Sequence, residues 1–252
     1  MLKRKPIIFA IDNVLPSDAL QMLRDTMSGQ YARKIIGEVK FNDVLHANGS
    51  GDMLRTIREE FPLLEIFADL KLPDVSSTNV NVLRRHADRG INRVTVTYVV
   101  SVRSILAIHA INPKTRITLY CVPTDMSEEE AVRRFGKTPF EIIRDALRGF
   151  EQEFNILGVP NPIGDCVCSG RELVALRRVF GDRYGFVVPG IRSEWMEADH
   201  QKRTMSPSEA LTLGAGQLVM GSQLRGTKGV PMQEAQRRTF EEVRRAYDGL
   251  AC

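Results

Sequence analysis

The chain has 252 residues, of which 43% are hydrophobic and 26% charged, a composition that supports a folded core and excludes an intrinsically disordered segment. Lys and Arg exceed Asp and Glu by 35 to 31, and this small excess is spread along the chain, which argues against a nucleic-acid partner. No apolar run approaches the roughly 18 residues that a membrane span requires. The four cysteines form no C-x-x-C pair, so we expect a cytoplasmic protein without disulfides or zinc.

Short apolar runs rich in β-branched residues alternate with amphipathic stretches along the chain. The runs predict strands at 7–11, 34–41, 65–71, 93–99, 116–122, 165–168, 184–188 and 217–220. Between them, apolar spacings of three and four predict helices, as at 17–27, 79–89 and 206–213. The long segment 123–164 is predicted to hold two helices in sequence.

The regular alternation of strand and helix indicates the fold class. Strands buried on both faces read as continuous apolar runs, and strands separated by helices pair in parallel. Eight such units in about 250 residues predict a closed (β/α)8 TIM barrel, with residues 1–252 as a single domain. An open doubly wound sheet is the alternative, but no G-x-G-x-x-G follows the first strand.

The stretch EIFADLKLPDV, at 65–75, carries the charged residues on which the functional interpretation depends. Because side chains alternate along a strand, Asp69 and Lys71 are predicted to project together into the mouth of the barrel. A proline precedes Asp74 and ends strand pairing, so Asp74 belongs to the loop above the barrel. Lys40, near the end of the second strand, is predicted to point toward the same pocket.

These four residues are expected to form an array in which positive and negative charges alternate. Flanking carboxylates favour the ammonium form of a buried lysine, and a held ammonium can protonate a carbanion. The alternative is an ordinary salt bridge at a strand end, which stabilises a protein little when it is exposed. The spacing of Lys40, Asp69, Lys71 and Asp74 leaves both interpretations open.

The sequence resembles the orotidine 5'-monophosphate decarboxylase family. DLKLPDVSST, at 69–78, is similar to the D-x-K-x-x-D signature of that family and its following threonine. The resemblance extends over nearly the whole chain, through FAID in the first strand, VVPGIRS from Val187, ADHQKRTMSPSEAL from Ala198 and LGAGQLVMG before the last helices. It implies a carboxy-lyase that converts orotidine 5'-monophosphate to UMP and carbon dioxide in de novo pyrimidine biosynthesis.

The resemblance also implies a role for each matching residue. Lys71 is implied as the proton donor to carbon 6 of the pyrimidine, and Asp69 lies against the departing carboxylate. Asp74 and Thr78 are implied to reach into the active site of a second subunit, which makes the protein a homodimer with shared sites. The residues implied to bind substrate are Asp12 and Lys40 at the ribose, Thr124 and Pro189 at the pyrimidine, and Arg192 and Gln201 at the phosphate.

Two segments depart from the pattern of the family. Met220-Gly221-Ser222 stands where V-G-R is usual, so the expected phosphate arginine is a serine. Arg225, three residues later, is the candidate replacement, with a solvated surface arginine as the alternative. In the fourth strand TVTYVVS replaces the usual V-H-A ending, which predicts altered packing beneath the site.

The implied chemistry requires no cofactor and no metal, because the protein stabilises the carbanion electrostatically and a side chain supplies the proton. One alternative is a related sugar-phosphate decarboxylase or synthase of the same barrel superfamily, in which a divalent metal stabilises an enediolate. The other is a barrel that binds nucleotides without turnover.

Overall fold

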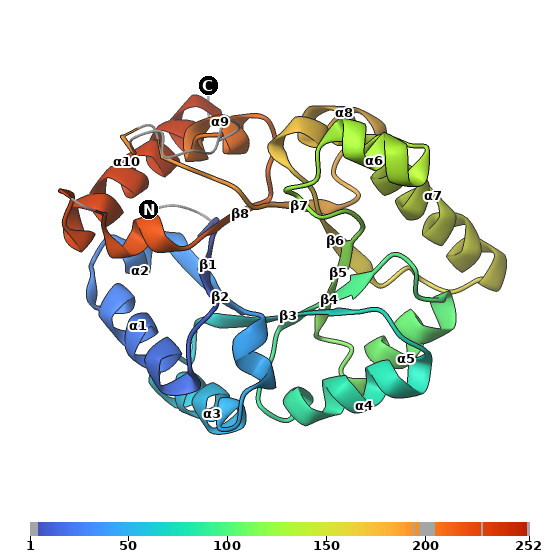
Figure 1. Cartoon of the computed structure of the whole chain (residues 1–252), viewed down its shortest axis with the longest axis horizontal. Helices are drawn as coiled ribbons and strands as arrows, with labels where there is room; N and C mark the ends of the chain where they lie inside the picture. Colours follow the sequence, from blue (N-terminus) through green and yellow to red (C-terminus); the bar gives the residue numbers. More distant parts are fainter. Residues whose placement is uncertain (1–4, 194, 197–204, 228, 251–252) are drawn as a thin grey trace.

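Eight parallel strands form a closed barrel in which each strand pairs with the next and the last returns to the first (Figure 1). The strands are β1 (Ile7–Ile11), β2 (Ile36–Phe41), β3 (Glu65–Leu72), β4 (Arg93–Thr97), β5 (Arg116–Tyr120), β6 (Ile163–Val167), β7 (Gly185–Val188) and β8 (Gln217–Met220). The structure is a computed structural model and describes residues 5–193, 195–196, 205–227 and 229–250. It confirms the predicted (β/α)8 barrel.

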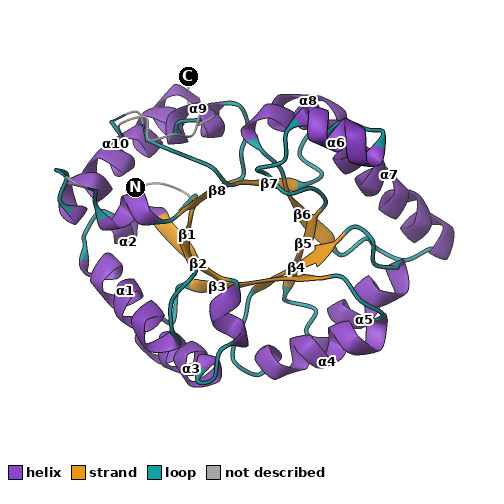
Figure 2. Cartoon of the chain, viewed as in Figure 1, coloured by secondary structure: helices purple, strands orange, loops and turns teal. Residues whose placement is uncertain are grey.

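Helices surround the strands as an outer ring (Figure 2). They are α1 (Pro16–Ser28), α2 (Ala32–Ile35), α3 (Ser50–Glu60), α4 (Ser76–Ala87), α5 (Val102–Ile111), α6 (Glu128–Phe135), α7 (Pro139–Leu157), α8 (Gly170–Phe180), α9 (Pro207–Thr212) and α10 (Met232–Leu250), with short 3₁₀ helices η1 (Asp43–His46) and η2 (Ser222–Arg225). None of the helices in the described ranges is long and apolar enough to cross a bilayer.

The helix ends follow from capping residues in the sequence. The predicted pair of helices after β5 is present as α6 and α7. Thr138 caps α7 through a capping box, in which its hydroxyl accepts a hydrogen bond from the Glu141 N–H and the Glu141 carboxylate accepts one from the Thr138 N–H. The predicted helix at 17–27 begins one residue earlier, at Pro16, because proline is favourable in the first turn.

Four strands are shorter than predicted, β7 by its first residue alone. The first two residues of the predicted segment 34–41 belong to the helical turn α2, so β2 begins at Ile36. β4 and β5 end together at the pair Thr97 and Tyr120, and each strand is followed by a loop. The sequence stays apolar past the end of β5 because Cys121 and Val122 are still buried, whereas Val99, after β4, is exposed.

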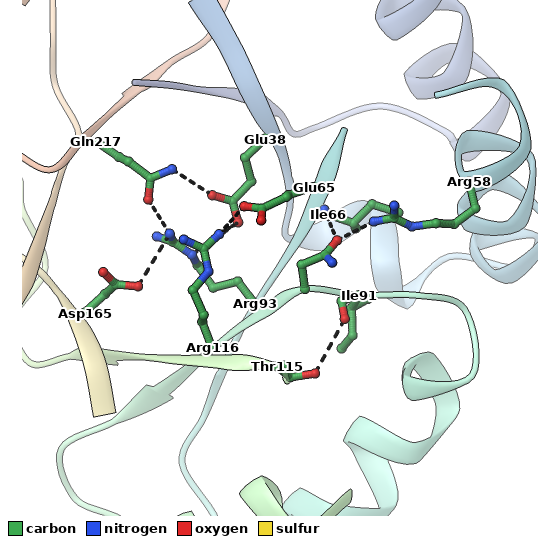
Figure 3. A network of polar contacts seen from close by, with 11 residues as sticks. Glu38, Arg58, Glu65, Ile66, Ile91, Arg93, Thr115, Arg116, Asp165 and Gln217 are labelled. Atoms are coloured by element: carbon green, nitrogen blue, oxygen red, sulfur yellow. Dashed lines mark hydrogen bonds and ion pairs between the residues drawn. The ribbon is translucent and has the colours of Figure 1, made fainter. Parts of the chain in front are cut away.

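A charged layer fills the barrel interior at the starts of the strands, where branched apolar residues are usual (Figure 3). It consists of Glu38, Glu65, Arg93, Arg116, Asp165 and Gln217. Nε of Arg93 lies 3.2 Å from Oε1 of Glu38, and its Nη2 lies 3.4 Å from Oδ2 of Asp165. Gln217 accepts a hydrogen bond from Arg93 and donates one to Glu38. The Arg93 and Glu38 side chains are both fully buried, so each charge depends on the others for solvation.

A small apolar cluster separates this layer from the far end of the barrel. Ile8, Phe67 and Val187 form the cluster, and Val167 and Val219 pack against it. Phe67 lies two residues after Glu65 and two residues before Asp69, and alternation along β3 turns all three inward. The interior therefore has charges at both ends and apolar side chains between them.

Candidate active site

Four charged side chains meet where β1, β2 and β3 end at the mouth of the barrel. Lys40 Nζ lies 2.9 Å from Oδ2 of Asp12 and 3.3 Å from Oδ2 of Asp69. Lys71 Nζ lies 2.8 Å from the same Asp69 oxygen. The charges therefore alternate in sign along the row Asp12, Lys40, Asp69 and Lys71.

The middle of this row is buried more deeply than its ends. The Lys40 and Asp69 side chains are 10% and 11% exposed, whereas Lys71 is 33% exposed. Burial by itself would raise the pKa of the Asp69 carboxyl, but the charges of Lys40 and Lys71, with hydrogen bonds from Lys71 and Thr95, outweigh it and lower that pKa. Asp69 is therefore an anion, and the Lys71 side chain beside it is more accessible to solvent than Lys40 or Asp69.

The backbone at Lys71 adopts a conformation that is unusual for a residue with a side chain. Its φ is +45°, in the left-handed region, and the pairing of β3 with β4 shifts between Ala68 and Leu72. Left-handed backbone costs about 1–2 kcal/mol at a non-glycine residue. Strain of this kind concentrates at functional sites, because the surrounding structure must hold it in place.

Thr95, in β4, holds both Lys71 and Asp69. Its hydroxyl accepts a hydrogen bond from the Lys71 N–H at 2.8 Å and donates one to Oδ1 of Asp69 at 2.8 Å. The Thr95 side chain is fully buried. One hydroxyl thus stabilises the strained backbone of the lysine and orients its carboxylate partner.

Sequence reasoning missed Thr95 and also Tyr120, whose ring centroid lies 5.2 Å from Lys71 Nζ. Both side chains come from strands that carry no charged motif at this end. The signal available in the sequence was alternation: Thr95 and Tyr120 occupy inward-facing positions that follow Arg93 and Arg116 at even spacings.

The loops after β1 and β2 are tied to each other and to β3. The N–H of Asn13, at φ +62°, donates to both Asp43 oxygens, at 3.0 and 2.9 Å. The Asn42 side chain donates to the Asp69 carbonyl at 2.8 Å. These bonds hold the strand ends that carry Asp12, Lys40 and Asp69 in one fixed arrangement.

Asp74 does not join the row of charges within one chain, contrary to the expected array of Lys40, Asp69, Lys71 and Asp74. Asp12 takes the fourth place instead. Asp74 is exposed in the loop after β3, where its carboxylate accepts a hydrogen bond from the Val75 N–H and its backbone bonds the Asn79 side chain. Thr78, in the first turn of α4, is also exposed.

The residues predicted at the pyrimidine lie in loops. Thr124 is exposed in the loop after β5, four residues past Tyr120. The chain leaves the β-ladder early because β5 pairs with β4 only as far as Tyr120. Pro189 directly follows β7 and is partly buried.

The residues predicted at the phosphate follow β7 and β8. Arg192 is partly buried and Arg225, at the end of η2, is exposed; within the described ranges neither guanidinium has a carboxylate partner. Gln223 ties the two loops together, since its side chain donates to the Ser193 hydroxyl at 3.1 Å. Gln201 lies outside the described residues.

The described part of the chain contains no group of three or more His, Cys, Asp or Glu side chains placed to hold a metal ion. At the mouth, each carboxylate of the row is instead neutralised by a lysine. The arrangement has the chemistry of an ammonium donor held beside a fixed anion.

Three kinds of comparison relate the chain to known proteins. The family model described as orotidine 5'-phosphate decarboxylase / HUMPS family matches residues 5–237. An orotidine 5'-phosphate decarboxylase of Parasynechococcus marenigrum is 29% identical over 227 residues, 85% of each chain. One of Aquifex aeolicus is 28% identical over 190 residues, 75% of this chain and 79% of the relative.

Solved structures agree on the fold. The crystal structure of orotidine 5'-phosphate decarboxylase from Lactobacillus acidophilus has a TM-score of 0.72 at 19% identity and covers 95% of this chain and 99% of its own. That from Pyrococcus horikoshii has a TM-score of 0.66 at 23% identity, with 94% and 99% covered. At these identities the likeness establishes the barrel alone.

Proposed function

Since the chain belongs to the orotidine 5'-phosphate decarboxylase / HUMPS family, we propose that it converts orotidine 5'-monophosphate to UMP and carbon dioxide. The observation that carries this proposal is the row of alternating charges at the barrel mouth, which ends on the Lys71 ammonium. The reaction is that of a carboxy-lyase in de novo pyrimidine biosynthesis.

In the proposed mechanism, the bond between carbon 6 of the pyrimidine and its carboxylate breaks. Carbon dioxide leaves, and the electron pair stays on carbon 6. Lys71 stabilises this carbanion by its positive charge and then transfers a proton from Nζ to carbon 6, after which solvent restores the ammonium. Asp69 lies beside the leaving carboxylate, and repulsion between the two anions favours the loss of carbon dioxide.

The remaining residues are proposed to bind the substrate. Asp12 and Lys40 bind the ribose hydroxyls, Thr124 and Pro189 contact the base, and Arg192, Gln201 and Arg225 hold the phosphate. The unpaired guanidinium groups of Arg192 and Arg225 in the described loops support the last assignment, since the phosphate site of a TIM barrel lies after β7 and β8. Binding energy from the phosphate is then available to orient the base over Lys71.

We further infer a homodimer in which Asp74 and Thr78 enter the site of the partner. The exposure of both residues, together with the absence of Asp74 from its own row of charges in the described structure, supports this inference. The cytoplasmic location stays a prediction from the sequence.

A decarboxylation assay that follows the absorbance of orotidine 5'-monophosphate tests the proposal. Lys71→Ala should abolish measurable turnover and leave the circular dichroism spectrum and unfolding midpoint near those of the parent. Lys137→Ala is the matched control, because it removes another lysine paired with an aspartate at 2.9 Å, at the surface. Near-normal turnover by the Lys71→Ala protein would refute the role of Lys71.

A sugar-phosphate substrate is the second candidate, because the matching family model covers more than one branch and Ser222 replaces the usual arginine. Turnover of orotidine 5'-monophosphate that a chelator leaves unchanged favours the decarboxylase. UMP binding without any turnover favours a nucleotide-binding barrel.

A further inference from the structure

Tyr120 occupies the last inward-facing position of β5. Arg116 and Thr118 precede it at the alternate positions that point into the barrel, whereas Ile117 and Leu119 belong to the core between strands and helices. Tyr120 is partly buried, and its ring stands at the level of the barrel mouth beside Lys71.

Among the residues that the structure describes, the Lys71 ammonium has one close anionic partner. Its Nζ lies 2.8 Å from Asp69, and the Tyr120 ring centroid is 5.2 Å away. Lys40 is held between Asp12 and Asp69, and the Thr95 hydroxyl contacts the backbone of Lys71. The ring face therefore supplies a second attraction for the ammonium, since the face of an aromatic ring is the negative end of its quadrupole.

We propose that Tyr120 is a positioning residue that holds the Lys71 ammonium over its ring, where the ammonium delivers the proton to the substrate. The inference rests on the proposed function of Lys71 as proton donor. Lysine has four rotatable side-chain bonds, so a contact that favours one placement of Nζ raises the fraction of molecules ready to react.

The ring, and not the hydroxyl, carries this role. Within the described ranges the Tyr120 hydroxyl makes no hydrogen bond to the protein. Burial raises the pKa of the phenol, and the negative charges of Asp69 and Asp125 raise it further, so the ring stays neutral at physiological pH. A phenylalanine should therefore substitute for Tyr120.

The test compares Tyr120→Leu with Tyr120→Phe. Loss of the ring should lower kcat about two- to tenfold, the size of a cation–π contact, with little change in KM. The Phe variant should keep the parent values of both quantities.

Tyr31→Leu is the matched control. Lys34 Nζ lies 5.2 Å from the Tyr31 ring centroid, so the control removes a contact of equal length, at the start of α2 and away from the barrel mouth. It should leave kcat and KM unchanged. Unfolding midpoints measured in parallel separate a loss of positioning from a loss of stability, and Tyr120→Met serves as the second ring-free variant if the Leu protein does not fold.

A parent-like kcat in the ring-free variant would overturn the inference, and so would equal losses of kcat in the Phe and Leu variants. The Lys71→Ala protein separates this failure from that of the proposed function. If Lys71→Ala retains activity, the proton-donor role itself is wrong. If Lys71→Ala is inactive while Tyr120→Leu matches the parent, only the role of Tyr120 is wrong.

Discussion

Single hydroxyl and aromatic groups support the charged row at the residue scale. Thr95 is the clearest case, because its one oxygen contacts both the backbone of Lys71 and the carboxylate of Asp69. Its loss would leave a buried N–H without a partner and Asp69 with one fewer donor. An unsatisfied buried group costs about 1–3 kcal/mol.

Thr95→Val keeps the side-chain volume and removes this oxygen. We expect kcat to fall about tenfold to a hundredfold, because a hydrogen bond to a charged group contributes about 1.5–3 kcal/mol. Steady-state kinetics check this expectation. Thr118→Val is the control, since the buried Thr118 hydroxyl has no hydrogen-bond partner among the described residues and its removal should leave kcat unchanged. Equal kinetics of the two variants would contradict the role of Thr95.

At the scale of elements, the charged layer at the strand starts links six strands of the barrel (Figure 3). Arg93 is its centre, with contacts to Glu38, Asp165 and Gln217 and a position over the Phe67 ring at 5.1 Å. A buried ion pair contributes little net stability compared with apolar packing, but removing one partner leaves a charge without compensation.

Arg93→Met should therefore destabilise the barrel by about 3–5 kcal/mol, measured by denaturant unfolding. Arg134→Met, which breaks an exposed pair with Glu130 on α6, should cost about 0.5 kcal/mol or less. A similar loss of unfolding free energy in both variants would show that Arg93 contributes no more to stability than an exposed ion pair does.

The loss of unfolding free energy in the Arg93→Met protein should also depend on pH. Burial already raises the pKa of Glu38, against the opposing charges of Arg93 and Arg116. Without Arg93 the folded protein holds a proton on Glu38 more tightly than the unfolded chain, whose glutamate pKa is about 4.3. The Arg93→Met protein then loses stability as pH rises above the glutamate pKa of the unfolded chain. Its loss of unfolding free energy relative to the parent should therefore be larger at pH 7 than at pH 5.

At the scale of the whole molecule, one chain supplies the row from Asp12 to Lys71 and leaves Asp74 and Thr78 exposed. Under the proposed dimer, each active site is completed by the loop after β3 of the partner. Activity would then depend on both chains.

Mixing Asp74→Ala and Lys71→Ala proteins tests the shared site. Each protein alone should be nearly inactive. After subunit exchange, a hybrid dimer holds one site with both native residues, so up to about one quarter of the parent activity should return in an equimolar mixture. Confirmed exchange without recovered activity would contradict a site that is shared between subunits.

The sequence by itself determined the barrel and the pair at the centre of the site. The alternation of apolar runs and amphipathic segments predicts eight strand–helix units. The two-residue spacing of Asp69 and Lys71 places both side chains on one face of the strand. Both patterns can be read from the sequence because they are local along the chain. The contacts of Thr95 and Tyr120 with this pair, and the ion pair of Asp12 with Lys40, were decided only by the tertiary structure. These residues lie on, or directly after, strands other than β3. The distance between inward side chains depends on the tilt and stagger of the closed barrel, which no local pattern encodes.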